Sequence, residues 1–477
     1  MKAPFSEYLT LQAPMIRRLI EELAGEYDYV SVLSADSTGF RVQVNRHDRK
    51  ISHSTLISER GHVVRVARDG LYGEYAFNEP DPAGAGAMAE RIRAALDQQL
   101  ELLRRTGTNA YETGLLPDEE LTLFVEKETG SLPEDTDPGQ LAEQLAGVCE
   151  QGLSCAPHAV ECIVTAQSTH ISKMFQTMHR DLRQSYLCSE GSVSVICGDG
   201  AERRTSHEGI SGCVGPELFE GLGACAETAA GHAEEQLGAS RVAPGEYDII
   251  TTPGVSGLIA HEAFGHGVEM DMFVKNRALG KDYIDKRVAS DLVTMHEGAL
   301  VAESVTAYAF DDEGTLAGDV TEIDAGILKS GICDALSALR LGTVPTGNGK
   351  RQNFAHKAYT RMTNTVFASG SSTLDEMIAS VQHGYLLDGV QSGMEDPKHW
   401  GIQCMIERGY EIRDGKLTGR VAAPVILTGY VPDLLGSVSM LSGECEVSGN
   451  GACGKGWKEW VKVADGGPCL KARARLG

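Results

Sequence analysis

The chain has 477 residues, 42% of them hydrophobic and 23% charged, which is typical of a globular protein with two or more domains. Its formal net charge of −24 argues against nucleic-acid binding, because no global basic excess is present to release counterions. The sequence contains no apolar run long enough to span a membrane, so we expect no membrane partner. The twelve cysteines lack regular spacing and the N-terminus lacks a signal peptide, so we expect reduced thiols and a cytoplasmic protein.

The N-terminal half predicts helices and antiparallel strands in two successive rounds. An amphipathic helix over 15–25 opens the first round, and a long helix over 83–105 closes it. Between them, short alternating runs separated by glycines predict a strand meander at 29–33, 39–44, 51–57, 62–67 and 71–77. A further strand over 121–125 precedes an acidic loop that contains proline, at 132–138.

The second round repeats this order. We expect a helix near 139–152, four strands and a helix near 215–237. The predicted strands are 159–166, 171–178, 182–188 and 192–197. The repeated order hints at an ancient duplication, although no residue-level repeat is visible.

The Gly/Pro-containing stretch 238–245 is the preferred domain boundary. We therefore predict an α+β protein, with an N-terminal domain of helices and antiparallel meanders over 1–240. The C-terminal domain over 241–477 is rich in glycine and short apolar runs, which favours a mostly-β fold. One helix is expected at 374–384, with Ser371, Ser372 or Thr373 as its cap.

The stretch from His261 to His266 contains two imidazoles and a carboxylate, Glu262, and follows a predicted strand and turn. Two neutral imidazoles can hold zinc, and a neighbouring carboxylate can act as base for its water. Histidines five apart lie about 140° from each other around an ideal helix, so both can reach one ion only if the helix bulges or ends. Gly265 and Gly267 would permit this. Two ordinary histidines on a helix broken by glycine are the alternative interpretation.

A third metal ligand must come from elsewhere, and a glycine-rich stretch near the C-terminus offers a cysteine. Cys453 lies between Gly451 and Gly454, on backbone that can approach another element closely. A thiolate is also a good zinc ligand. Cys445 and Cys469 are near enough in the sequence to compete for the role.

Two regions contain further candidate residues. In the Gly/Asn/Thr-rich stretch 343–365, we assign Arg361, Thr363 and Asn364 to substrate binding, since a guanidinium can bind a carboxylate and an amide can bind a peptide group. A turn with a structural arginine is the alternative there. Glu269 and Asp271 are candidates for orienting the histidines, and solvated acids at a helix end are the alternative.

The C-terminal segment is locally basic and contains tryptophan. We expect a solvated or packed tail, with a partner-binding surface as the alternative. The residues concerned are Lys455, Trp457, Lys458, Trp460, Lys462, Lys471, Arg473 and Arg475.

These motifs resemble the TldD/PmbA metallopeptidases, also called modulators of DNA gyrase, and in particular the metal-bearing TldD type. The resemblance rests on the stretch from His261 to Asp271 and continues through 345–349, 361–365 and 453–455, in the family's order and approximate spacing. It covers the C-terminal half well. The N-terminal half is similar only in length and general pattern.

The resemblance implies that His261, His266 and Cys453 are the zinc ligands and that Glu262 is the catalytic base. It also implies a dimer, formed either with a metal-free sister subunit or with a second copy. The implied reaction is amide hydrolysis of an extended, unfolded peptide by a zinc-activated water, with Glu262 transferring the proton.

Two other functions stay open on the sequence. The protein could be a non-enzymatic interaction protein, a modulator of gyrase or of a toxin–antitoxin system, with a structural metal. It could also be a cysteine hydrolase that uses Cys453 and one histidine, although Glu262 would then have no role.

Overall fold

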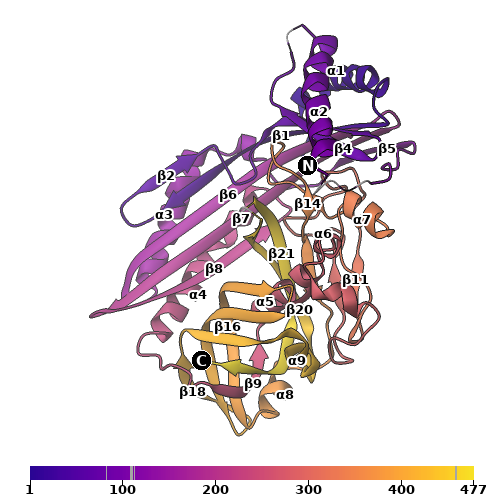
Figure 1. Ribbon diagram of the computed structural model, residues 1–477. Helices are drawn as coiled ribbons and strands as arrows, with labels where there is room; N and C mark the ends of the chain where they lie inside the picture. Colours follow the sequence, from indigo (N-terminus) through magenta and orange to yellow (C-terminus); the bar gives the residue numbers. More distant parts are fainter. Residues whose placement is uncertain (82, 108–110, 112, 457–458) are drawn as a thin grey trace.

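Two large β-sheets organise the protein in the computed structural model, which describes residues 1–81, 83–107, 111, 113–456 and 459–477 (Figure 1). Helices cover parts of both sheets, so the expected α+β class is confirmed. Within the described residues, no helix is both long and apolar enough to cross a membrane.

The first sheet has eight strands in the order β4-β3-β1-β6-β7-β5, with β2 beside β1 and β8 beside β7. They are β1 (Tyr29–Val44), β2 (Arg49–Ser52), β3 (Arg60–Arg68), β4 (Leu71–Phe77), β5 (Leu121–Glu126), β6 (Ala159–Gln176), β7 (Arg180–Asp199) and β8 (Glu202–Gly212). Several are longer than predicted: the runs expected at 159–166 and 171–178 form one strand, because β6 pairs with β7 along its whole length.

Two helix pairs pack on this sheet at different ends (Figure 1). The first pair is α1 (Glu7–Ala24) and α2 (Ala85–Thr106), and the second is α3 (Pro138–Ser154) and α4 (Leu222–Glu235). Helix α1 begins eight residues before the predicted start, since the Ser6 side chain accepts a hydrogen bond from Leu9 N and caps it. Two short 3₁₀ turns are η1 (Pro133–Asp135) and η2 (Pro216–Gly221).

The second sheet has eleven strands in the order β12-β11-β10-β15-β21-β19-β17-β16-β9, with β18 beside β17 and β20 beside β21. They are β9 (Gly245–Thr251), β10 (Met295–Glu297), β11 (Val320–Asp324), β12 (Ile327–Leu328), β15 (Asn364–Phe367), β16 (His383–Asp396), β17 (Gly401–Arg413), β18 (Lys416–Ala422), β19 (Val425–Tyr430), β20 (Met440–Lys455) and β21 (Glu459–Leu476). The strands β13 (Gly349–Lys350) and β14 (Tyr359–Thr360) pair separately.

Helices in this half are short, as the mostly-β prediction requires. They are α5 (Pro253–Ala260), α6 (Asp271–Val274), α7 (Ala335–Leu341), α8 (Leu374–Ala379), α9 (Val431–Gly436), the π turn η3 (His261–Gly265) and the 3₁₀ turns η4 (His266–Val268) and η5 (Leu279–Tyr283). The predicted helix at 374–384 ends at Ala379 because the chain enters β16 at His383, and Thr373 and Glu376 form a capping box at its start.

The C-terminal segment is packed: as strand β21 it pairs with β15, β19, β20 and β9. Trp457 and Lys458 lie outside the described residues. Strands β20 and β21, yellow in Figure 1, rise from the second sheet towards β7 and β8 of the first. There the Asn450 amide donates to the carbonyls of Gly191 and Ile210, at 2.9 Å each. The domain limits 1–240 and 241–477 stay a prediction.

Candidate metal centre

The helix that carries the histidines changes its winding between them, as their spacing predicts. After α5, the His266 N–H donates to the His261 carbonyl, which is the i→i+5 bond of a π turn. This bond brings the two imidazoles together, with ring centroids 5.0 Å apart. Gly265 has ordinary helical dihedrals, so the π turn does not need its conformational freedom. A side chain is excluded there because a Cβ would lie 2.2 Å from Met362 Sδ.

The third member of the cluster comes from strand β20. The ligand atoms of His261, His266 and Cys453 lie within 4.8 Å of one another, and Cys453 Sγ is 3.2 Å from His266 Nε2. Cys445 and Cys469 are on the same hairpin but outside this cluster. The structure thus brings together the three residues proposed as ligands, and their role in binding metal stays a prediction.

Cys453 has an unusual electrostatic environment. Burial opposes ionisation of its thiol, but the imidazoles of His266 and His261 outweigh that effect and lower its pKa to about 4. The same pairing raises the pKa of both histidines against the effect of their burial. The sulfur is therefore a thiolate at neutral pH, which is the form that binds metal.

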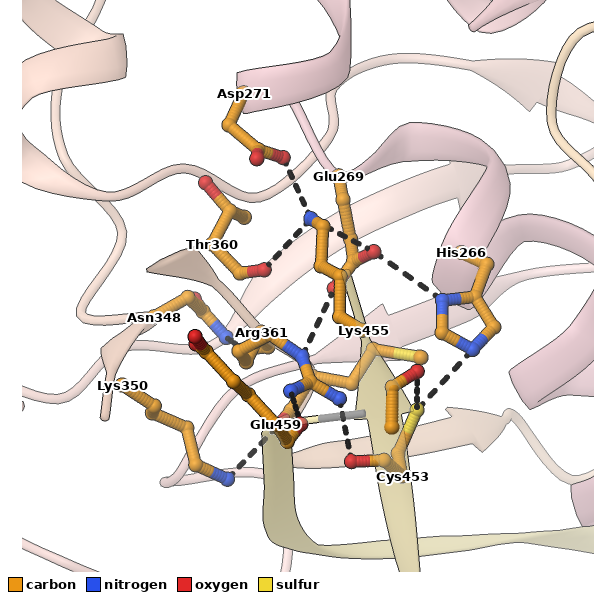
Figure 2. A network of polar contacts seen from close by, with 12 residues as sticks. His266, Glu269, Asp271, Asn348, Lys350, Thr360, Arg361, Cys453, Lys455 and Glu459 are labelled. Atoms are coloured by element: carbon orange, nitrogen blue, oxygen red, sulfur yellow. Dashed lines mark hydrogen bonds and ion pairs between the residues drawn. The ribbon is translucent and has the colours of Figure 1, made fainter. Parts of the chain in front are cut away.

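A chain of carboxylate and ammonium groups supports His266 (Figure 2). Glu269 accepts from His266 Nδ1 at 3.2 Å, and Lys455 Nζ lies 3.1 Å from the same carboxylate oxygen. Lys455 also donates to Asp271 at 2.7 Å. Because Nδ1 is hydrogen-bonded to Glu269, the ring is oriented so that Nε2 faces Cys453. Asp271, the other predicted orienting residue, reaches the histidine only through Lys455 and Glu269.

Arg361 lies beneath the cluster and is only 1% exposed. Its guanidinium donates to the carbonyls of Cys453 at 2.7 Å and Glu459 at 3.0 Å, and so holds the two strands of the hairpin (Figure 2). Its Nε is also 3.6 Å from Glu269. These contacts fix the backbone that presents the Cys453 side chain.

The other two predicted substrate-binding residues are also inside the protein. Thr363 is fully buried and donates to Glu297 through both its N–H and its hydroxyl, at 2.6 Å each. Asn364 is equally buried and donates to the Gly298 carbonyl at 2.9 Å. All three residues already have protein partners, and any contact with substrate stays a prediction.

Glu262 follows His261 directly and is 7% exposed. Burial raises the pKa of its carboxyl, and the two histidines act in the opposite direction. The residue lies at the edge of the cluster, against Gly393 of strand β16. A carboxylate beside the proposed metal ligands is the arrangement that general base catalysis requires.

Two acidic residues near the cluster were not singled out on the sequence. Asp465 Oδ2 is 3.8 Å from His261 Nδ1, and burial raises the pKa of Asp465 to about 6. The sequence Asp-Gly-Gly at this position is typical of a turn, but Asp465 lies within strand β21. Glu395 on β16 faces Gly267, and burial raises its pKa to about 9. Neither carries a local motif, because strand pairing alone brings both to the site.

The cluster fits a zinc ion. Two imidazoles and a thiolate are a usual zinc donor set, and three protein ligands leave a coordination position open. His261 Nδ1 is buried without a hydrogen-bond partner among the described residues, which is costly for a nitrogen that has no other role. Glu269 and Lys455 supply the outer support that metal-binding histidines usually have.

Comparison with known proteins agrees with a metal centre. Residues 244–465 match the family model described as PmbA/TldA metallopeptidase C-terminal domain. A metalloprotease of Synechocystis sp. is 27% identical over 482 residues, covering 96% of this chain and 97% of that protein. A zinc metalloprotease TldD homolog of Saccharolobus solfataricus is 30% identical over 245 residues, covering 50% of this chain and 53% of that protein.

The fold is shared with solved structures. The crystal structure of TldE from Thermococcus kodakarensis matches with a TM-score of 0.74 at 17% identity, covering 97% of this chain and 100% of that chain. The names of the relatives and the matching domain model support a metallopeptidase family. These findings support the TldD/PmbA family, and with it the resemblance drawn from the motifs of the chain.

Proposed function

We propose that this protein is a zinc-dependent peptidase of the metal-bearing TldD type, which hydrolyses unfolded peptides. The observation that carries the proposal is the position of Glu262, a carboxylate directly beside the His261, His266 and Cys453 cluster. When bound, zinc supplies Lewis acidity that lowers the pKa of water and polarises a carbonyl oxygen. Relatives named metalloprotease, one of them zinc metalloprotease, support the metal and the reaction class.

The protein's own residues divide the work of the reaction. Glu262 takes the proton of the attacking water and passes it to the leaving amine. Glu269 and Lys455 hold His266 in its orientation, and Arg361 holds the Cys453 backbone. Because these supporting groups are buried and hydrogen-bonded, the cluster is preorganised.

The substrate is an extended peptide that adds as a strand. Strand β16 passes Glu262 at Gly393. On the side opposite β17, it pairs with β9 only over Gly384–Leu387, within the part of the chain that the structure describes. The stretch 389–396 therefore offers main-chain groups beside the proposed base, which suits β-strand addition.

We further propose that the chain works as a dimer, with a second copy or with a metal-free sister subunit. This assembly is implied by the family resemblance. Light scattering of the purified chain tests the homodimer, and co-purification with a sister subunit tests the heterodimer.

Peptide digestion followed by mass spectrometry tests the activity. Cleavage should stop with a chelator and return with zinc. Glu262→Gln should retain zinc and fold but lose hydrolysis by orders of magnitude, since only proton transfer is removed. Glu444→Gln, a matched change at an exposed site on β20, should behave as wild type.

Other outcomes identify the alternative functions. If Glu262→Gln cleaves at the wild-type rate, Glu262 is not the base and the mechanism is wrong. Cleavage that persists without zinc but needs Cys453 indicates a cysteine hydrolase. A zinc-bound protein without any peptidase activity indicates a structural metal in an interaction protein.

A further inference from the structure

A cavity lies between the two sheets, against the hairpin that carries Cys453. Its volume is about 60 Å³, several times the roughly 10–15 Å³ that one water needs. Strands β6 and β7 line it on one side, and β13, β21 and the loop over 305–312 line the other. Its wall includes Val461, which also packs with Cys453, but none of His261, His266 and Cys453 lines it. The cavity is therefore distinct from the metal centre.

Most charged side chains of this cavity have a protein counterion. Lys173 pairs with Asp312, and Lys462 pairs with Glu190. Arg351 pairs with a carboxylate outside the cavity, that of Glu74. These pairs are buried, and each neutralises its own charge. Within the described ranges, Asp311, which also lines the cavity, has no ionic partner but accepts hydrogen bonds from three backbone N–H groups. One cation and one other carboxyl group of the described wall remain without an ionic partner.

The cation is Lys350. It is 8% exposed, and its ammonium donates to the carbonyls of Met362 at 2.9 Å and Lys462 at 2.5 Å. An ammonium has three donors, so one is unused. No carboxylate lies within 4.0 Å of it among the described residues. Burial lowers its pKa to about 7. In Figure 2, Lys350 lies on the far side of Arg361 from His266.

The carboxyl group is Glu59. It accepts one hydrogen bond, from Phe354 N at 2.6 Å, and burial raises its pKa to about 7. Within the described chain, no lysine or arginine forms an ion pair with it, although Lys173 and Arg351 act on its charge from farther away. The Tyr186 ring borders the same cavity, and its hydroxyl has no hydrogen-bond partner among the described residues.

We propose that this cavity binds a small zwitterion of the α-amino acid class, with the ligand carboxylate on Lys350 and its ammonium on Glu59. A buried charge without a partner is costly, and a zwitterion supplies both missing partners at once. Tyr186 offers a further hydrogen bond to the ligand. The volume of the cavity restricts the ligand to a small side chain. The site does not depend on the proposed peptidase activity.

Calorimetric titration of the zinc-loaded protein with L-alanine tests the site. Two analogues separate the contributions: N-acetyl-L-alanine lacks the ammonium, and L-alaninamide lacks the carboxylate. We expect alanine to bind and each analogue to bind at least about tenfold more weakly, as the loss of a charge-assisted hydrogen bond implies. Absence of alanine binding at tens of millimolar would overturn the proposal, and so would equal binding of all three.

Three variants assign the binding to the cavity. Glu59→Gln and Lys350→Met should each weaken alanine binding at least about tenfold, and Tyr186→Phe should weaken it less. Lys329→Met, a matched change at an exposed lysine that does not line the cavity, should bind as wild type. If Lys350→Met does not fold, Glu59→Gln still decides. Unchanged alanine binding in Glu59→Gln would refute the assignment.

Discussion

Gly393 of strand β16 lies directly against the carboxylate of Glu262: a Cβ at this glycine would be 2.5 Å from Glu262 Cγ and 2.7 Å from its Oε1. Such distances are shorter than van der Waals contact, so any side chain here has to displace either the strand or the carboxylate. The strand that we propose as the substrate's partner thus also fixes the position of the proposed base.

Gly393→Ala is therefore expected to move Glu262 while leaving the metal ligands in place. We predict normal zinc content with peptide hydrolysis reduced by about tenfold or more, since a misplaced base loses its near-attack geometry. Steady-state kinetics and elemental analysis on the same preparation measure both. Gly401→Ala is the control, because a Cβ there meets nothing within 4 Å. Equal loss in both variants would mean that the contact with Glu262 is unimportant.

Replacement of Cys453 tests the third ligand. We predict about one zinc per chain for the wild type and a large loss in Cys453→Ser, because a serine hydroxyl is a much poorer ligand than a thiolate. Cys445→Ser and Cys469→Ser should retain zinc, since both cysteines lie outside the cluster. Full zinc in Cys453→Ser together with loss in either neighbour would reverse the assignment.

The hydrogen bond between Glu269 and His266 should increase the affinity of the protein for zinc. Glu269→Gln removes the charge that accepts from His266 Nδ1, and we predict zinc affinity about 10- to 100-fold lower. Competition with a chromogenic chelator measures it. Lys275→Met serves as control, because Lys275 contacts Asp271 and no histidine. Wild-type affinity in Glu269→Gln would show that the contact does not orient the ligand.

The break in the histidine helix could be predicted from the sequence because it depends on local spacing. His261 and His266 are five positions apart, which does not fit one face of an α-helix, and this mismatch alone predicts the break that the structure contains as a π turn. The general pattern of strands and helices also follows from local periodicity.

The surroundings of the site depend on long-range pairing and could not be predicted. Arg361 looks like a ligand-binding residue in a loop, but it is buried because the β20–β21 hairpin folds over it. Asp465 precedes two glycines and resembles a turn, yet it pairs with Ser448 inside a strand. The register of a hairpin is set by packing in three dimensions, which no local pattern records.

Burial of His62 in the first sheet should make the free energy of unfolding depend on pH. The residue is fully buried, its Nδ1 is 2.7 Å from Ser34 Oγ, and burial lowers its pKa to about 4. Between pH 6.5 and 4 the unfolded chain binds a proton here that the folded protein does not, so stability falls as the pH decreases.

Between pH 7 and pH 5 we expect the wild type to lose about 2 kcal/mol more unfolding free energy than His62→Gln. Urea denaturation at both pH values measures the difference. His47→Gln is the control, since His47 is exposed in the loop between β1 and β2. An identical pH dependence of wild type and His62→Gln would show that folding does not shift the pKa of this imidazole.

The last prediction follows from the proposed strand addition and concerns whether the substrate is folded or unfolded. A peptide that pairs with β16 over 389–396 must be extended, and its main chain supplies the affinity with little sequence preference. Folded proteins do not offer a free strand of that length, so we predict that one protein is cleaved much faster after irreversible unfolding than in its native state. For short peptides, kcat/KM should rise with length until the unpaired edge of β16 is filled, and then level off. Mass spectrometry of timed digests measures both effects, with Glu262→Gln as the inactive reference. Equal rates on native and unfolded protein, or rates independent of peptide length, would show that the site recognises something other than an extended backbone.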